Sequence, residues 1–199
     1  MTSLPKGWPV NDRYSPKYLW SPSISKPTIE FMTQTPLSSS SEASLFPSTC
    51  HQNSTRKPSP KVKIKKILDK GHPAFGQHGL FAAETLHAES FILDYVGQVV
   101  LDSQASQTSD YTMSFIKGLA GNIQDLAIDA EKVGNEARFI NDYRGISQEP
   151  NVKFENYRNA LGKVCVGVWV LKRAGKIKKG DEITVSYGKG FWANRRTYS

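Results

Sequence analysis

The sequence predicts a mainly β domain with few short helices, and two observations carry that prediction. From residue 61 onward, short apolar runs enriched in Val, Ile, Tyr and Phe alternate with glycine-containing turns, which is the pattern of β-strands. Before residue 61, prolines recur from Pro5 to Pro60, and the apolar residues follow neither the period of a strand nor that of a helix. No internal repeat of roughly 20–50 residues is present, so a solenoid or a propeller is not indicated.

Residues 1–60 are expected to form a disordered, Pro/Ser-rich N-terminal tail. Such a segment buries too little apolar surface to offset the entropy of ordering its backbone. Its aromatic residues stand out, and they form either a short docking motif or solvated side chains: Trp8, Tyr14, Tyr18 and Trp20.

Residues 61–67 alternate basic and apolar side chains, as a half-buried strand does, although the same lysines could serve as a nuclear-import patch. Further strands are expected within residues 79–83, 90–100, 111–116, 126–129, 164–171 and 182–187, and one helical piece near 132–139. The folded domain should therefore span residues 61–192, followed by a short basic C-terminal tail at 193–199.

Charge and cysteine content restrict the function classes. The 199 residues suit one domain plus a tail, and the net charge of +8 is concentrated in residues 172–199. This basic surface favours nonspecific contact with nucleic acid or nucleosomes, or it is simply solvated. Two cysteines cannot form a disulfide framework or a four-thiolate zinc site, and Cys165 reads as a buried small hydrophobe. No apolar run approaches the roughly 18 residues of a membrane span, and no secretory leader is indicated.

Four segments stand out, and their order along the chain matters. The first, GQHGLFA at residues 76–82, is a glycine-rich turn that lets the backbone approach a ligand closely. The second, FILDYVG at 91–97, is a strand that ends at a glycine. The third is GNEARFINDY at 134–143 with PN at 150–151, and the fourth is IKKGDEITVSYG at 177–188 with FW at 191–192.

This ordered set resembles the SET-domain family of protein lysine methyltransferases, over roughly residues 62–192. The resemblance implies a β-fold of several small sheets with a C-terminal pseudoknot, in which the third motif passes through a loop formed by the C-terminal part. It further implies that S-adenosyl-L-methionine binds in a cleft on one face, and that the target lysine enters from the opposite face through a narrow aromatic tunnel.

The resemblance also assigns residues. Tyr187 corresponds to the catalytic tyrosine at the methyl-transfer site. The expected cofactor-binding set is Gln77, His78, Gly79, Arg138, Asn141, Asp142 and Trp192. The expected substrate tunnel is lined by Tyr111, Trp169 and Phe191.

Some of these residues also have ordinary structural interpretations. Arg138 would order the threaded segment rather than react, and Trp169 could equally be a core aromatic residue of a strand. His78 is more readily a solvated turn histidine than an acid or base.

The chain departs from the family pattern in four places. The leading glycine of the turn is either replaced or displaced by one residue, to Gly76, and Asp142 stands where the family usually has histidine. A longer polar linker fills residues 143–149, and the cysteine cluster that often follows the domain is absent. Phe191 and Trp192 are therefore expected to close the tunnel with apolar walls and no metal.

The leading hypothesis is methyl transfer from S-adenosyl-L-methionine to the ε-amine of a lysine in a protein, with a histone tail or nucleosome as the expected substrate. A tunnel poor in charged groups suits this chemistry, because burial disfavours the ammonium form of lysine. We expect a monomer in the nucleus, with the cytoplasm as the alternative. Two other hypotheses are a catalytically inactive SET module that binds chromatin or a protein partner, and a nucleic-acid-binding β domain.

Overall fold

The computed structural model describes residues 4–9, 12–34, 45–49, 57–188 and 191–192. Strands dominate it, as the sequence predicts, and the helical elements are short. The α-helix is α1 (Lys26–Thr33), and the 3₁₀ turns are η2 (Asp102–Gln104), η3 (Glu136–Phe139) and η4 (Lys172–Ala174). No helix in these residues is long and apolar enough to cross a membrane.

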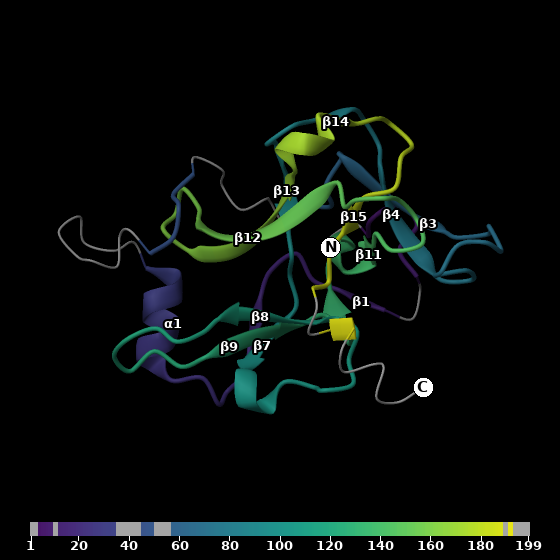
Figure 1. Cartoon of the computed structure of the whole chain (residues 1–199). Coiled ribbons are helices and arrows are strands. Elements are labelled where there is room, and N and C mark those ends of the chain that lie inside the picture. The colour runs from purple at the N-terminus through teal and green to yellow at the C-terminus, as the bar shows by residue number, and fades with distance from the viewer. Residues whose placement is uncertain (1–3, 10–11, 35–44, 50–56, 189–190, 193–199) are drawn as a thin grey trace.

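Two sheets have more than two strands. The four-stranded sheet has the order β2 (Leu19–Trp20), β7 (Gln98–Leu101), β9 (Leu126–Asp129) and β8 (Thr112–Ile116). The three-stranded sheet has the order β12 (Val152–Arg158), β13 (Val164–Val170) and β6 (Phe91–Asp94). Figure 1 shows β12 and β13 above β7, β8 and β9, with the two sheets facing one another across the domain.

Four further pairs of strands surround these sheets. They are β3 (Val62–Lys66) with β4 (His78–Ala82), β5 (Leu86–His87) with β14 (Lys176–Ile177), β1 (Arg13–Tyr14) with β10 (Val133–Gly134), and β11 (Asn141–Asp142) with β15 (Thr184–Val185). This arrangement of several small sheets confirms the predicted fold class.

The parallel pair β11–β15 joins the two longest sequence motifs. Asn141 pairs with Thr184 and Asp142 with Val185, and the amide of Tyr143 continues the ladder to the carbonyl of Val185 at 3.0 Å. The third and fourth motifs, far apart in sequence, therefore lie side by side, as the expected pseudoknot requires.

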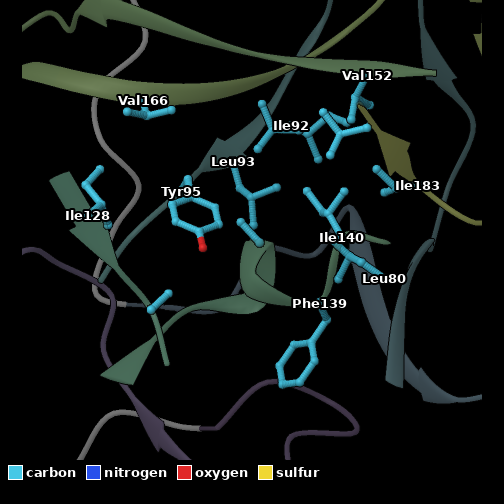
Figure 2. Packing of buried hydrophobic residues seen from close by; sticks show 14 of the residues in the cluster. Leu80, Ile92, Leu93, Tyr95, Ile128, Phe139, Ile140, Val152, Val166 and Ile183 are labelled. Atoms are coloured by element: carbon cyan, nitrogen blue, oxygen red, sulfur yellow. The ribbon is translucent and has the colours of Figure 1, made fainter. Parts of the chain in front are cut away.

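The sheets share one hydrophobic core. Figure 2 shows Leu80 of β4, Ile92 of β6, Val152 of β12, Ile140 and Ile183 converging on a common centre. Each of these side chains is at most 4% exposed. Because isolated two-stranded pairs are marginally stable, this shared core is what holds the small sheets in place.

The largest strand pair was only half predicted. β13 lies where residues 164–171 predict a strand, but its partner β12 was missed, although seven residue pairs join the two. Polar Lys153, Glu155 and Asn156 interrupt the apolar pattern of β12, so its sequence does not read as a strand. Pairing with the buried strand β13 fixes its conformation instead.

Two other expectations need correction. The strand expected at 90–100 divides into β6, which pairs with β13, and β7, which pairs with β9 in the other sheet. The helical piece expected near 132–139 consists of β10 followed by the single 3₁₀ turn η3.

The N-terminal segment differs from the expected disordered tail. In residues 4–34, outside 10–11, strands β1 and β2 add to β10 and β7, and α1 buries Met32 in the core. β1, β2 and α1 are too short to show a hydrophobic period in the sequence. They are ordered by contacts with strands of the domain. Residues 35–44, 50–56 and 193–199 lie outside the described residues, so the C-terminal tail is not described.

Trp8 anchors this N-terminal arm, residues 4–34. Its ring is 8% exposed and packs edge-on against Tyr14 and Phe139, with centroid distances of 5.1 and 5.4 Å. Its indole nitrogen donates to the carbonyl of Asp12 at 2.7 Å.

We expect Trp8→Ala to lower the free energy of unfolding by about 3 kcal/mol, because it leaves a cavity in the core. Leu4→Ala, at a side chain that is 59% exposed, is the control and should change it by less than about 0.5 kcal/mol. Urea unfolding measures both. Equal effects of the two variants would contradict the anchoring role.

A buried acid, Asp94, ends strand β6 of the three-stranded sheet. Asp94 is 7% exposed and accepts a hydrogen bond of 2.8 Å from the hydroxyl of Tyr157. Burial raises the pKa of the Asp94 carboxyl from 3.8 to about 7, although the bond from Tyr157 acts in the opposite direction. The folded protein thus holds the proton on Asp94 more tightly than the unfolded chain does.

Because the pKa of Asp94 is raised on folding, the stability linked to it is present below about pH 4 and is lost as the pH rises through about 7. In the unchanged protein, the free energy of unfolding should fall between about pH 5 and pH 8 as Asp94 loses its proton. We expect Asp94→Asn, which keeps an acceptor for Tyr157, to make this fall smaller by roughly 2–3 kcal/mol. Urea titrations at both pH values measure this difference. Parallel pH profiles for the two proteins would show that Asp94 does not cause this pH dependence of the unfolding free energy.

Candidate functional site

A cavity of about 530 Å³ opens where the motifs meet. This volume lies within the range of small-molecule sites. Its walls come from the glycine turn, from η3 and β11, from Tyr187, Phe191 and Trp192, and from the N-terminal arm. The lining includes Pro9, Asp12, Pro73, Ala74, Gln77, His78, Asp110, Tyr111, Arg138, Phe139, Asn141, Asp142, Arg144, Tyr187, Phe191 and Trp192.

The glycine turn is built from two glycines with different roles. Gly76 has φ +83°, a conformation that disfavours other residues, and its amide donates to the carbonyl of Ile67 at 3.0 Å. Gly79 is needed for close approach, since a Cβ there would come within 2.7 Å of Glu182 Oε1 and 3.3 Å of Asn141 Nδ2. The displaced glycine therefore still makes the turn, and Gly79 lets it lie directly against Asn141.

Arg138 is buried and organises the wall of the cavity. Its guanidinium donates to the carbonyls of Ala130 at 2.8 Å and Glu131 at 2.9 Å, and it forms an ion pair with Asp12. It also lies 4.4 Å from the ring centre of Tyr111. These contacts favour the structural interpretation of Arg138, and they place Tyr111 at the wall of this cavity.

Asp142 holds the C-terminal wall. Its carboxylate accepts hydrogen bonds from the amide of Tyr187 at 2.8 Å and from the indole of Trp192 at 3.3 Å, and both of its oxygens face the guanidinium of Arg144. Phe191 packs edge-on between Tyr187 and Trp192, at 4.7 and 5.3 Å. The aspartate at the family's histidine position thus fixes the segment that the sequence predicts as the closing wall.

Tyr187 is a neutral hydroxyl group aimed at the backbone. Its hydroxyl donates to the carbonyl of Ile140 at 2.8 Å. Burial, and next the charge of Asp142, raise the pKa of Tyr187 well above its ordinary value. The phenol therefore keeps its proton near neutral pH, and it offers a ligand the lone pairs of its oxygen.

A second, smaller cavity of about 300 Å³ adjoins the first. The two share the lining residues Asp110, Arg138, Tyr187 and Phe191. Tyr95, Met113, Ile140 and Phe154 complete much of the second lining, and the rings of Tyr95 and Phe154 meet edge-on at 5.3 Å. Tyr187 thus lies at the junction of a larger polar cavity and a smaller, mainly apolar one.

Comparison with known proteins agrees with this geometry. The SET-domain family model matches residues 77–188. The chain belongs to the SET-domain family. It is 30% identical over 148 residues to the histone-lysine N-methyltransferase ASHR3 of Arabidopsis thaliana, covering 70% of this chain and 26% of that protein. It is 29% identical over 146 residues to the histone-lysine N-methyltransferase mes-4 of Caenorhabditis elegans, covering 65% and 14%.

The chain therefore spans about a quarter of the length of the first relative. Among solved structures, it resembles a chain of the polycomb repressive complex 2 of Chaetomium thermophilum, with a TM-score of 0.50 and 21% identity over 67% of this chain and 16% of that one. This likeness shows that the fold is shared.

Most predicted site residues of this SET domain line the larger cavity, and two of them, Gly79 and Trp169, line neither cavity. Tyr111, expected in the substrate tunnel, lines the larger cavity and not the smaller one. Trp169 packs against Phe91 at 5.1 Å and Tyr157 at 5.7 Å in a separate cluster that also contains buried Cys165. The core interpretation of Trp169 is the one that fits, and Phe154 lines the smaller cavity instead.

Several lining residues were missed by sequence reasoning. Phe154 follows the Pro150-Asn151 motif by three residues, and Tyr95 lies within the second motif, so motif position could have indicated both. Asp12 and Pro9 come from a segment that carries no motif, and no sequence signal indicated them. Among the described residues, no group of three or more His, Cys, Asp or Glu side chains could hold a metal ion.

We expect Asp142→Ala to lower the free energy of unfolding by about 2–4 kcal/mol, because it leaves Arg144 and the amide of Tyr187 without their acceptor. Asp69→Ala is the control, since Asp69 is exposed and accepts one local bond, from Gly71. Chemical unfolding followed by circular dichroism measures both. A loss no larger than that of Asp69→Ala would contradict the anchoring role of Asp142.

Proposed function

We propose that this SET domain transfers a methyl group from S-adenosyl-L-methionine to the ε-amine of a lysine in a protein. The observation that carries the proposal is the position of Tyr187 at the junction of the two cavities. One cavity is large enough for a nucleoside cofactor, and the other is smaller, mainly apolar and suited to an aliphatic side chain.

The residues of the larger cavity fit this cofactor. The carboxylates of Asp12, Asp110 and Asp142 exceed the guanidinium groups of Arg138 and Arg144 by one charge, which suits a cationic ligand. Phe139, Phe191 and Trp192 offer aromatic faces. Gln77 and His78 border the same space, and Asn141 contributes an amide. When bound, the cofactor supplies an electrophilic methyl group on a sulfonium, with a neutral thioether as the leaving group.

The smaller cavity suits a neutral lysine. The pKa of free lysine is about 10.4, so keeping the amine uncharged at pH 7 costs about 4–5 kcal/mol in water. Tyr95, Ile140 and Phe154 reduce the solvation of the ammonium form, which lowers that cost. Solvent takes the proton before the reaction, and no strong base is needed in this cavity.

Tyr187 orients the reacting groups. Its proton is committed to the carbonyl of Ile140, so its oxygen acts toward the amine as an acceptor. A fixed acceptor at the junction directs the amine lone pair toward the larger cavity. Alignment of this kind can lower the activation barrier by roughly 7–11 kcal/mol. Phe191, which packs on Tyr187, excludes water from the same point.

A histone is the proposed substrate, because the relatives are named histone-lysine N-methyltransferases. The net charge of +8 favours encounter with nucleosomes, whose DNA is acidic. On this proposal the protein acts in the nucleus as a monomer.

A catalytically inactive SET module is the second candidate. It is favoured by one observation: Asp142, at the family's histidine position, binds Arg144, Tyr187 and Trp192 rather than leaving its polar atoms to a ligand. Calorimetry decides between the candidates, since an inactive module of this kind would not bind the cofactor at millimolar concentration.

We expect Tyr187→Phe to reduce the transfer of labelled methyl groups to core histones at least about a hundredfold, because the acceptor at the junction is lost. The assay uses purified protein with radiolabelled S-adenosyl-L-methionine, and mass spectrometry locates the modified lysine.

Tyr143→Phe is the matched control, since the Tyr143 side chain does not line the cavity, and its rate should stay within about twofold of the unchanged protein. Undiminished labelling by Tyr187→Phe would contradict the role of Tyr187. Absence of labelling by the unchanged protein on histones and on a cell extract would contradict the proposed activity.

A further inference from the structure

His72 lies in the loop before the glycine turn, outside the residues that the SET-domain model matches. Its side chain is 11% exposed, and its Nε2 lies 3.0 Å from Glu182 Oε2, whose side chain is 10% exposed. The amide of Ala74 donates to its Nδ1 at 3.0 Å. Because Nδ1 accepts this bond, the neutral ring carries its hydrogen on Nε2 and donates it to Glu182.

Glu182, held by His72, in turn contacts Asn141. Its other oxygen, Oε1, accepts a hydrogen bond of 2.9 Å from Asn141 Nδ2. The carboxylate is also confined on the side of Gly79, where even a Cβ would come within 2.7 Å of Oε1. Neither His72 nor Glu182 lines the large cavity, whereas Asn141 does.

The two partners of the Asn141 amide determine its orientation. The second neighbour of Nδ2 is the carbonyl oxygen of His78, at 3.4 Å. A carboxylate and a carbonyl can only accept, so the nitrogen of the amide must face them and the oxygen is left for the cavity. The cavity therefore gains an acceptor that suits an N–H donor, such as an ammonium or an exocyclic amine.

We propose that His72 is a positioning residue for the cofactor cavity: through Glu182 it holds Asn141 with its carbonyl oxygen toward the ligand. This inference rests on the proposed function and deepens it. Without His72, one oxygen of Glu182 loses its donor, the carboxylate can rotate toward water, and the amide of Asn141 is no longer fixed. The neighbouring Pro73 and Ala74 belong to the cavity wall, so the same loop forms the wall and fixes the amide behind it.

The test is calorimetric binding of S-adenosylhomocysteine, the unreactive product that keeps the amines of the cofactor. We expect His72→Ala to weaken binding about tenfold, the change that one hydrogen bond to a charged group corresponds to. His87→Ala is the matched control, because His87 is exposed on β5, and it should bind within about twofold of the unchanged protein.

Two conservative variants separate positioning from general loss of structure. The amide nitrogen of glutamine is as many bonds from Cβ as Nε2 of histidine, whereas that of asparagine corresponds to Nδ1. His72→Gln should therefore restore binding to within about threefold, and His72→Asn should resemble His72→Ala. In a double-mutant cycle, His72→Ala should add no further loss of binding to a protein that already carries Glu182→Ala.

A spectrum of the unchanged protein tests the network without any variant. Long-range correlation of the ring nitrogens with the ring hydrogens should show the Nε2–H form of His72, and the Nδ1–H form would overturn the proposal. Equal binding by His72→Gln and His72→Asn would overturn it as well, as would unaltered binding by His72→Ala. If the unchanged protein does not bind S-adenosylhomocysteine, the proposed function itself fails. This result differs from equal binding by the unchanged protein and His72→Ala, which contradicts only the role of His72.

Discussion

The parallel pairing of β11 with β15 is the constraint on which the rest of the site depends. It places Asn141 and Asp142 beside the strand that leads to Tyr187. Asp142 then holds the backbone of Tyr187, and Ile140 accepts the hydroxyl of the same residue. Because a parallel pair needs a long connection, residues 143–183 between the two strands are free to supply the largest strand pair of the domain.

The sequence was a good guide to this fold wherever a segment carries its own pattern. β3, β8, β9 and β13 alternate or are continuously apolar, and each lies where residues 61–67, 111–116, 126–129 and 164–171 predict a strand. β12 and the N-terminal arm carry no such pattern. Their conformation comes from partners elsewhere in the chain, and a local reading of the sequence contains no information about those partners.

The residues of the candidate site likewise fall into those that a motif predicts correctly and those whose position depends on partners elsewhere in the chain. Gln77, His78, Arg138, Asn141, Asp142, Tyr187, Phe191 and Trp192 line one cavity, and all of them stood in recognisable motifs. Trp169 was assigned to the tunnel from its position in the family resemblance, but the β-bulge between Val168 and Trp169 accompanies its packing on Phe91 and Tyr157. Direction of a side chain depends on register, and register is set by neighbouring strands rather than by residue type.

The ion pair between Asp12 and Arg138 has a consequence for how the chain folds as it is synthesised. Residue 12 leaves the ribosome long before residue 138, and β1 and β2 likewise precede their partners β10 and β7. The arm must wait, unpaired, until most of the domain has been translated, because such non-local contacts form only after the intervening chain is available. A wall of the cavity that assembles late is thus made by residues that are translated before the rest of the domain.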